Sequence, residues 1–343
     1  MPRMKRKYVI RGLWAVAVLL LLAFLALVFL FWVWRQPLSF PAQPYLLTVP
    51  KGASLNHVAA MLTQDGVLKH PWQLTLLARA QREATAIKAG RYRFEETETV
   101  ESLLQKLVDG ATVPVAITIA EGSTFADLKR MLRERPEVAN TVLDESDEKI
   151  LQAIGATETS PEGLFFPDTY YIAVGNDDVS VLKMSYQMMQ ARLNDGWEKR
   201  QEGLPLASPY EALILASIVE KETGMASDRP LVASVLINRL KLGMRLQVDP
   251  SVIYGLERFD GSLRRSDLTT DTPYNTYTRS GLPPTPIALV SQASLDAVLQ
   301  PADTKYLYFV SRKDGSGSSE FSEDLGNHNR AVHRFIKKRQ NHP

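Results

Sequence analysis

Two glutamates near the middle of the chain, Glu220 and Glu222, have the residue type and setting that acid catalysis needs. They lie in the last turn of Ser208–Gly224, a stretch whose helical pattern is apolar on every side, which predicts a buried helix. Glu220 projects in line with Ala216 and Leu213, one and two turns back. Desolvation by these neighbours and the negative end of the helix dipole both raise the pKa of a carboxyl. A carboxyl that stays protonated near neutral pH can act as a general acid, and the sequence therefore predicts this role for Glu220.

The same residues have a second interpretation, in which Glu220, Lys221 and Glu222 are the solvated end of a helix and have no chemical role. Glu222 follows Glu220 by two positions and so lies about 200° further round the helix. The two carboxyls therefore cannot both face one scissile bond. We expect Glu220 to be catalytic and Glu222 to be structural.

The start of this helix carries a strong local signal. Ser208 is a typical N-cap, Pro209 suits the first helical position, and Glu211 completes a capping box three residues after the cap. The rest of the chain has to position this helix and build a binding surface around its charged end.

The composition limits the class of protein. The chain has 343 residues, of which 45% are hydrophobic, and its 40 basic and 38 acidic residues nearly balance. This is enough for about two domains, and the balance argues against nucleic acid as a partner. There is no cysteine, and the five histidines are scattered without metal-ligand spacing, so neither a metal nor a cofactor is expected.

The N-terminal segment has the features of a single-pass membrane anchor. Residues 13–34 carry no charge and can cross a bilayer core of roughly 30 Å at ~1.5 Å per residue. Tryptophans lie near both ends, and residues 1–12 are rich in lysine and arginine, which predicts a cytoplasmic N-terminus. Phe31–Trp34 is not a small-residue cleavage site, so we do not expect a cleaved signal peptide.

An internal near-repeat follows the proline-rich linker 35–45. Leu47–Ser54 matches Ile117–Thr124, and each copy predicts a strand, a glycine turn, a Ser/Thr cap and an amphipathic helix. The repeat indicates a small α+β module over residues 46–150 that resembles LysM-like folds. The module is either a glycan-binding unit or a plain spacer, and the chain is expected to divide again near residues 136–160.

Residues 155–340 are predicted to form a larger catalytic domain. Polar and aromatic side chains gather in its loops, where they suit a saccharide groove. The fold class is thus α+β: a transmembrane helix, a small LysM-like α+β module, and a larger mixed α+β domain around a buried helix. The candidate substrate-binding residues are Asp168, Gln247, Asp249, Tyr254, Asn275 and Tyr277.

Several long motifs in a fixed order resemble those of the YceG-like endolytic murein transglycosylases, and the resemblance runs from the anchor almost to the end of the chain. The motifs are Glu162-Gly163, Phe166–Tyr170, Ala216–Thr223, Asn238–Leu240, Gly243–Pro250, Tyr274–Tyr277, Gly281–Pro284, Tyr306–Val310 and His328-Asn329. One departure is Ser319, which stands where the family pattern has histidine.

The resemblance implies an inner-membrane enzyme with a periplasmic catalytic domain. Such an enzyme cuts nascent peptidoglycan strands internally, leaves 1,6-anhydro-N-acetylmuramic acid ends and so acts as a terminase of glycan polymerisation. The family's catalytic glutamate falls on Glu220. Peptidoglycan strands, the inner membrane and peptidoglycan synthases are the partners that it implies.

Two other functions stay open. A muramidase-type hydrolase would need a second carboxylate, for which Asp168 and Asp249 are the candidates. A membrane-tethered wall-binding scaffold would need no catalytic residue. The chemistry of the product ends separates the three: anhydro ends, reducing ends or intact strands.

The anchor leads to a first prediction, that residues from about Gln36 onward lie outside the cytoplasm. Protease added to spheroplasts should degrade this part of the chain, because the basic flank holds the N-terminus inside. Full protection of the large domain would contradict the predicted orientation.

Overall fold

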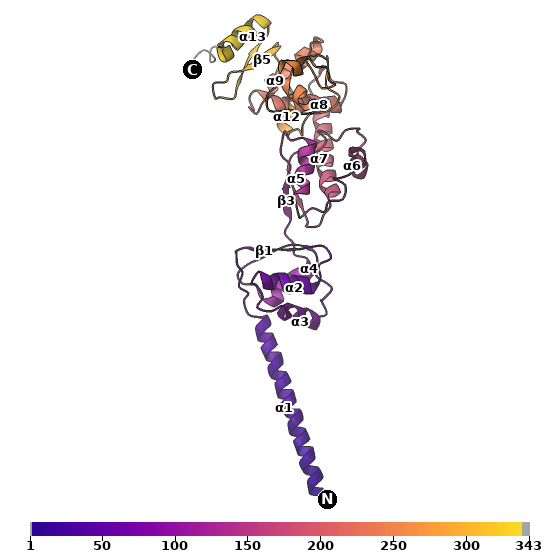
Figure 1. Ribbon diagram of the computed structural model, residues 1–343, viewed down its shortest axis with the longest axis vertical. Helices are drawn as coiled ribbons and strands as arrows, with labels where there is room; N and C mark the ends of the chain where they lie inside the picture. The colour runs from indigo at the N-terminus through magenta and orange to yellow at the C-terminus, as the bar shows by residue number, and fades with distance from the viewer. Residues whose placement is uncertain (1, 338–343) are drawn as a thin grey trace. The chain divides into compact units, whose positions relative to one another are not determined.

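The computed structural model describes residues 2–337, which form two compact units of mixed α and β structure (Figure 1). The first unit holds the chain up to Val115 together with Tyr171–Gly175. The second holds Ala116–Tyr170 and the chain from Asn176 on. The predicted end of the catalytic domain at residue 340 lies outside the described residues.

Helix α1 (Pro2–Trp34) contains the predicted anchor. Its stretch Leu13–Trp34 has 22 residues with a mean hydropathy of 3.1, and it is long and apolar enough to cross a membrane. The basic side chains predicted to flank it, in residues 1–12, lie outside the described side chains.

The rest of the first unit is a small α+β fold. Its strands pair antiparallel with Leu47 opposite Tyr92, and both of these side chains are buried in one apolar core. The elements are β1 (Tyr45–Val49), α2 (Leu55–Gln64), α3 (Trp72–Ala80), β2 (Gly90–Phe94) and α4 (Val100–Asp109).

The near-repeat has the predicted local structure in both copies. β1 and α2 form the first copy, while β3 (Val115–Thr118) and α5 (Phe125–Arg133) form the second. The glycine turn has positive φ in each, +81° at Gly52 and +67° at Gly122, which an L side chain would strain. Ser54 and Thr124 then cap the two helices by accepting the amide three residues on.

The second copy of the repeat belongs to the second unit, which differs from the predicted division near residues 136–160. Gly122 N donates to Leu289 O at 2.8 Å, and Leu289 N donates to Ser123 O at 2.7 Å. These bonds tie the repeat's turn to a loop far along the chain, so the chain divides near Val115 instead. Sequence periodicity finds a repeat but cannot show which neighbours it packs against.

The remaining elements are mostly helices joined by long loops, and apart from the second half of β4 they belong to the second unit. In the part of the chain that is described, they are α6 (Asp147–Ile154), β4 (Thr169–Ile172), α7 (Asp178–Glu198), α8 (Pro209–Glu222), α9 (Arg229–Lys241), α10 (Asp249–Tyr254), α11 (Arg265–Thr269), α12 (Gln292–Leu299), β5 (Tyr308–Ser311), β6 (Ser319–Ser322), α13 (Leu325–Val332) and a π-helical turn (His333–Lys337). β3 pairs with β4, and β5 pairs antiparallel with β6.

Helix α8 lies at the centre of this unit and packs against α7, α9, α10 and α12. Every side chain from Ala212 to Val219 is buried. Ser208 caps the helix by accepting from Glu211 N at 3.2 Å, but the Glu211 carboxylate accepts from Ala207 N rather than completing the predicted capping box. Burying each large apolar side chain contributes about 1.5–3 kcal/mol to the free energy of unfolding. The packing therefore fixes the position of α8, including that of its C-terminal end.

A buried carboxylate holds the loop before α6 against α7. Asp178 is fully buried, and its carboxylate accepts from the backbone amides of Thr141, Val142 and Leu143 at 2.9–3.1 Å. Burial alone would raise the pKa of Asp178, but the hydrogen bonds from Thr141, Val142 and Leu143 lower it below its ordinary value.

Asp178→Asn should therefore lower the free energy of unfolding by about 2–4 kcal/mol, because buried amides lose a charged acceptor. Since the pKa is lowered in the folded state, this stabilisation is lost as the pH falls. Asp195→Asn, which removes an exposed ion pair between α7 and its C-cap Lys199, should change stability by less than about 0.5 kcal/mol. Denaturant unfolding followed by circular dichroism compares the two. Equal effects would show that Asp178 does not order the loop.

Candidate active site

An open cavity of about 430 Å³ lies beside the C-terminal end of α8. Its walls come from α8, α9, the loop that leads into α10, strand β5 and α13, all in the second unit. The lining residues are Glu222, Arg239, Leu246, Gln247, Asp249, Tyr277, Tyr308, Phe309, Leu325, His328 and Asn329.

Glu222 is the acidic group that α8 presents to this cavity. Its side chain is partly buried, and burial together with the negative charge of Asp249 raises its pKa from 4.5 to about 7. Near neutral pH a large fraction of this carboxyl is therefore protonated. A protonated carboxyl on the wall of an open polar cavity can donate a proton to a bound molecule.

Asp249 and Tyr277 form a pair within the same cavity. Tyr277 Oη donates to Asp249 Oδ1 at 2.6 Å, while the Asp249 side chain stays exposed. Burial and this hydrogen bond raise the pKa of the Tyr277 hydroxyl. The pair thus presents one exposed carboxylate with a fixed orientation, and its negative charge acts on Glu222.

Asn275 positions Tyr277 and does not line the cavity. It is fully buried, its side-chain amide donates to Asp267 O and Thr270 O, and its Oδ1 accepts from Tyr277 N at 2.9 Å. We expected Asn275 to touch substrate. The structure instead uses all of its polar atoms within the protein.

Gln247 reaches the cavity in an unusual backbone conformation. Its φ is +52°, and its amide donates to Thr276 O at 3.1 Å. Thr276 Oγ1 also accepts from Val248 N at 3.0 Å. Two neighbouring hydrogen bonds therefore hold Gln247 in the left-handed region, where a side chain other than glycine is strained.

Arg239 ties together three parts of the cavity wall. Its guanidinium donates to Leu246 O and Leu307 O at 2.8 and 2.7 Å, and it lies 5.2 Å from the centre of the Tyr308 ring. His328 stacks on Tyr308, with ring centres 5.2 Å apart. Burial lowers the pKa of both Arg239 and His328, and a positive charge on Arg239 adds to the effect on the histidine. Among residues 2–337, the buried Nδ1 of His328 has no hydrogen-bond partner.

Glu220 is not among the residues that line this cavity. Its Oε2 accepts from Ser291 N at 3.1 Å and from the Ser291 hydroxyl, which caps α12. Glu220 therefore connects the end of α8 to the start of α12. The two glutamates do point to different sides, as the 200° separation requires, but the cavity lies on the side of Glu222.

The last two predicted residues, Tyr254 and Asp168, lie outside this cavity as well. Tyr254 Oη donates to Glu162 Oε2 at 3.0 Å, beside a smaller cavity of about 170 Å³. Asp168 is exposed at the start of β4, where its carbonyl accepts from Ile119 N. Of the six predicted substrate-binding residues, the structure thus brings Gln247, Asp249 and Tyr277 together.

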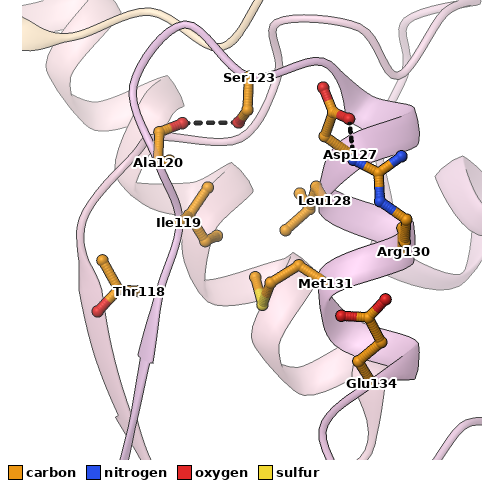
Figure 2. A pocket seen from close by; sticks show the side chains of 9 residues that line it. All are labelled: Thr118, Ile119, Ala120, Ser123, Asp127, Leu128, Arg130, Met131 and Glu134. Carbon is orange, nitrogen blue, oxygen red and sulfur yellow. Dashed lines mark hydrogen bonds and ion pairs between the residues drawn. The ribbon is translucent and has the colours of Figure 1, made fainter.

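A separate hollow of about 290 Å³ lies between β3 and α5, in the second copy of the repeat (Figure 2). Two of its charged side chains are paired, since Arg130 Nη2 lies 2.5 Å from Asp127 Oδ1. Ser123 Oγ donates to Ala120 O at 2.6 Å on the opposite wall. None of the predicted catalytic or substrate-binding residues lies here.

For four residues of the main cavity, the sequence analysis either assigned a different role or assigned none. Glu222 was expected to be structural, and Arg239, Tyr308 and His328 lay in the quoted motifs without an assigned function. The motif positions were the only signal for these three. Within residues 2–337, no group of three or more His, Cys, Asp or Glu side chains is placed to hold a metal ion.

The fold and the cavity together define a class: an α+β protein with a helix long enough to cross a membrane and an open polar cavity that carries a protonatable glutamate. The model of the YceG-like family matches residues 47–334, which is most of the chain. The chain therefore belongs to the YceG-like family.

Its relatives carry one activity in their names. The chain is 29% identical over 309 residues to the endolytic murein transglycosylase of Bacillus subtilis, with 84% of each chain covered. It is 25% identical to the enzyme of that name from Streptococcus pneumoniae, of which it covers 58%. A crystal structure of a putative YceG-like protein from Listeria monocytogenes covers 84% of the chain and is itself 98% covered, with a TM-score of 0.55 and 26% identity.

Glu162 provides a test of how burial controls ionisation in this unit. It is 5% exposed, and burial raises its pKa to about 7 despite hydrogen bonds from Phe125 N and Tyr254 Oη. Because the folded pKa exceeds the ordinary 4.5, the free energy of unfolding should fall by about 3 kcal/mol as the pH rises from about 4.5 to 7.

Glu162→Gln should remove this part of the pH dependence and leave the part that Glu222 contributes. Thermal unfolding between pH 4 and 8 measures both. Glu198→Gln, at an exposed position in α7, is the matched control and should leave the curve unchanged. An unaltered slope in Glu162→Gln would mean that this carboxyl ionises normally.

Proposed function

We propose that this protein is an endolytic murein transglycosylase that cuts peptidoglycan strands at the β-1,4 bond between N-acetylmuramic acid and N-acetylglucosamine. The observation that carries the proposal is the carboxyl of Glu222, which has a pKa of about 7 and lies in an open cavity with Gln247, Asp249 and Tyr277. The names of the relatives from B. subtilis and S. pneumoniae support the same activity.

Glu222 acts first as the general acid. Its proton passes to the glycosidic oxygen as the bond from that oxygen to the anomeric carbon breaks, which leaves an oxocarbenium-like sugar and a glutamate carboxylate. The environment suits this step, because desolvation and the negative charge of Asp249 both disfavour the carboxylate form of Glu222 and so raise its pKa.

The C6 hydroxyl of the same muramic acid then attacks the anomeric carbon. Its proton returns to the Glu222 carboxylate, and the new bond closes a 1,6-anhydro ring. No water is consumed, and one carboxyl serves as acid and then as base. A lytic mechanism therefore needs only one catalytic residue at this point.

The neighbours of Glu222 orient the sugar and support the charge that develops on it. The Asp249 carboxylate, fixed by Tyr277, lies on the cavity wall where it can stabilise a positive anomeric carbon. Gln247 is exposed and supplies both a donor and an acceptor for sugar hydroxyls.

Asp249 also supports a second candidate, a muramidase-type hydrolase. Two carboxyls in one cavity are the usual equipment of a glycoside hydrolase, in which the second acts as a nucleophile or activates water. Product analysis on purified glycan strands separates the two: the lytic enzyme leaves anhydro ends, and the hydrolase leaves reducing ends.

The proposal extends to the rest of the chain. We propose that α1 anchors the protein in the inner membrane with the catalytic unit in the periplasm, where cutting nascent strands would end their polymerisation next to peptidoglycan synthases. The β1–α2–α3–β2 order with antiparallel strands supports a LysM-like interpretation of the first unit.

Replacing each of the two glutamates of α8 separately by glutamine tests the assignment. Glu222→Gln keeps the volume but cannot deliver a proton, so cleavage should fall by about 10²–10⁴-fold or more while the fold is retained. Glu220→Gln is the matched control on the same helix and should keep substantial activity, since Glu220 accepts from Ser291, the N-cap of α12, and does not line the cavity. Release of anhydro-muropeptides from purified glycan measures both.

The opposite pattern, with Glu220→Gln inactive and Glu222→Gln active, would contradict the assignment and restore the expectation drawn from sequence. Near-normal cleavage by both variants would contradict acid catalysis from this helix altogether.

The pH profile should depend on Asp249. Cleavage by the unaltered enzyme should decline as the pH rises through about 7, because Glu222 must be protonated. Asp249→Asn removes a negative charge that raises the pKa of Glu222, so the decline should begin at lower pH. A profile of kcat/KM against pH measures the shift, and an unmoved or upward-shifted limb would mean that Asp249 does not act on Glu222.

A further inference from the structure

A second open cavity, of about 400 Å³, lies in the first unit where α1 meets the small α+β fold. One wall comes from the last turns of α1 and includes Phe29, Trp32 and Val33. Another wall comes from the turn before α3 and the start of that helix, and includes Lys69, His70 and Trp72. The cavity takes no part in the proposed cleavage.

The end of α1 is held firmly against the fold at this place. Trp34 Nε1 donates to Gln73 O at 2.9 Å, and the Trp34 ring packs against the core of the unit. Val33 is only 9% exposed. The cavity therefore keeps a fixed position relative to the end of the apolar span.

That position is at the edge of a bilayer if Leu13–Trp34 crosses it. Phe29 lies five residues before Trp34, which is roughly 7–8 Å along the helix axis. The cavity thus extends from the depth of the outer acyl carbons, beside Phe29, to the headgroup region beside Lys69. Tryptophan is the side chain that favours this boundary.

Helix α3 presents large apolar side chains on the same part of the fold. Trp72 is 38% exposed and Leu76 is 40% exposed, and their spacing places them on one helix face. The Trp72 ring stacks on His70, with centres 6.5 Å apart. Exposed apolar groups next to a membrane-spanning helix are stabilised by contact with lipid.

The positive charge at the end of the cavity beside Lys69 favours an anion. Lys69 is exposed, and within residues 2–337 it forms no ion pair with an acidic side chain. A phosphate is the anionic group that a bilayer supplies at this depth.

We propose that this cavity binds a phospholipid, with an acyl chain along Phe29 and Trp32 and its phosphate at Lys69, and that α3 lies in the membrane interface. The inference rests on the proposed anchoring of α1. The bound lipid and α3 would hold the first unit against the bilayer surface instead of leaving it free on a tether.

The chain contains no cysteine, so single cysteines can carry a spin label without further changes. The full chain is reconstituted in phosphatidylglycerol-containing nanodiscs, and collisions of the label with a water-soluble nickel chelate and with oxygen report its depth. Leu76→Cys should show several-fold less contact with the chelate than Lys51→Cys, a position next to β1. β1 is drawn on the far side of this unit from α1 (Figure 1).

Leu22→Cys, in the middle of the apolar span, separates two kinds of failure. A label that is deep at residue 22 but aqueous at residue 76 would overturn the inference and leave the anchor intact. A label that is aqueous at both positions would overturn the anchor and the inference with it.

Lipid retention tests the cavity itself. Native mass spectrometry of the full chain released from phosphatidylglycerol nanodiscs should show bound phospholipid, and Lys69→Ala should lower its retention about fivefold, the effect of one basic residue near an anionic surface. Lys51→Ala is the control and should change nothing. Equal retention in both variants, or retention of a polyprenyl phosphate in place of phospholipid from a mixed bilayer, would contradict the assignment.

Discussion

The ionisation of Glu222 depends on where the buried central helix of the second unit ends. Helix α8 is apolar on all sides, so packing against four other helices fixes its axis and rotation, and its last turn emerges beside an open cavity. At this point a carboxyl is desolvated and lies near the charge of Asp249. A small rotation of α8 would move Glu222 out of the cavity, and the surrounding core resists it.

Part of the cavity wall is made of loops, and hydrogen bonds give these loops the rigidity that regular structure would otherwise provide. Arg239 donates to two carbonyls from separate segments, and Thr276 and Asn275 use their side chains to fix the backbone around Gln247 and Tyr277. A buried amide or guanidinium without a partner is costly, so each of these groups specifies one loop conformation. Positioning residues under the surface therefore matter as much as those that face a ligand.

The sequence predicts the helices of this protein better than it predicts their neighbours. The cap at Ser208, the long apolar helix and the strand, turn and helix order of both repeat copies follow from local patterns and are present in the structure. Local patterns do not favour Glu222 over Glu220, because both sides of the last turn carry a carboxyl. Our proposal of Glu222 rests on the tertiary packing, which places Glu222 beside the open cavity. Asn275 and Tyr254 were predicted to bind substrate for a similar reason: a polar side chain has the same sequence signal whether it contacts the protein or the substrate. Ser319, which departs from the family pattern, donates its amide to Asp228 and does not line the cavity.

The most direct measurement is a structure of the Glu222→Gln protein with an uncleaved glycan strand bound. Our account predicts that the scissile glycosidic oxygen lies within hydrogen-bonding distance, about 2.6–3.2 Å, of the side chain at residue 222, with the adjoining muramic acid against Asp249 and Gln247. A strand bound with its scissile oxygen beside Glu220 and Ser291, or outside this cavity altogether, would contradict it.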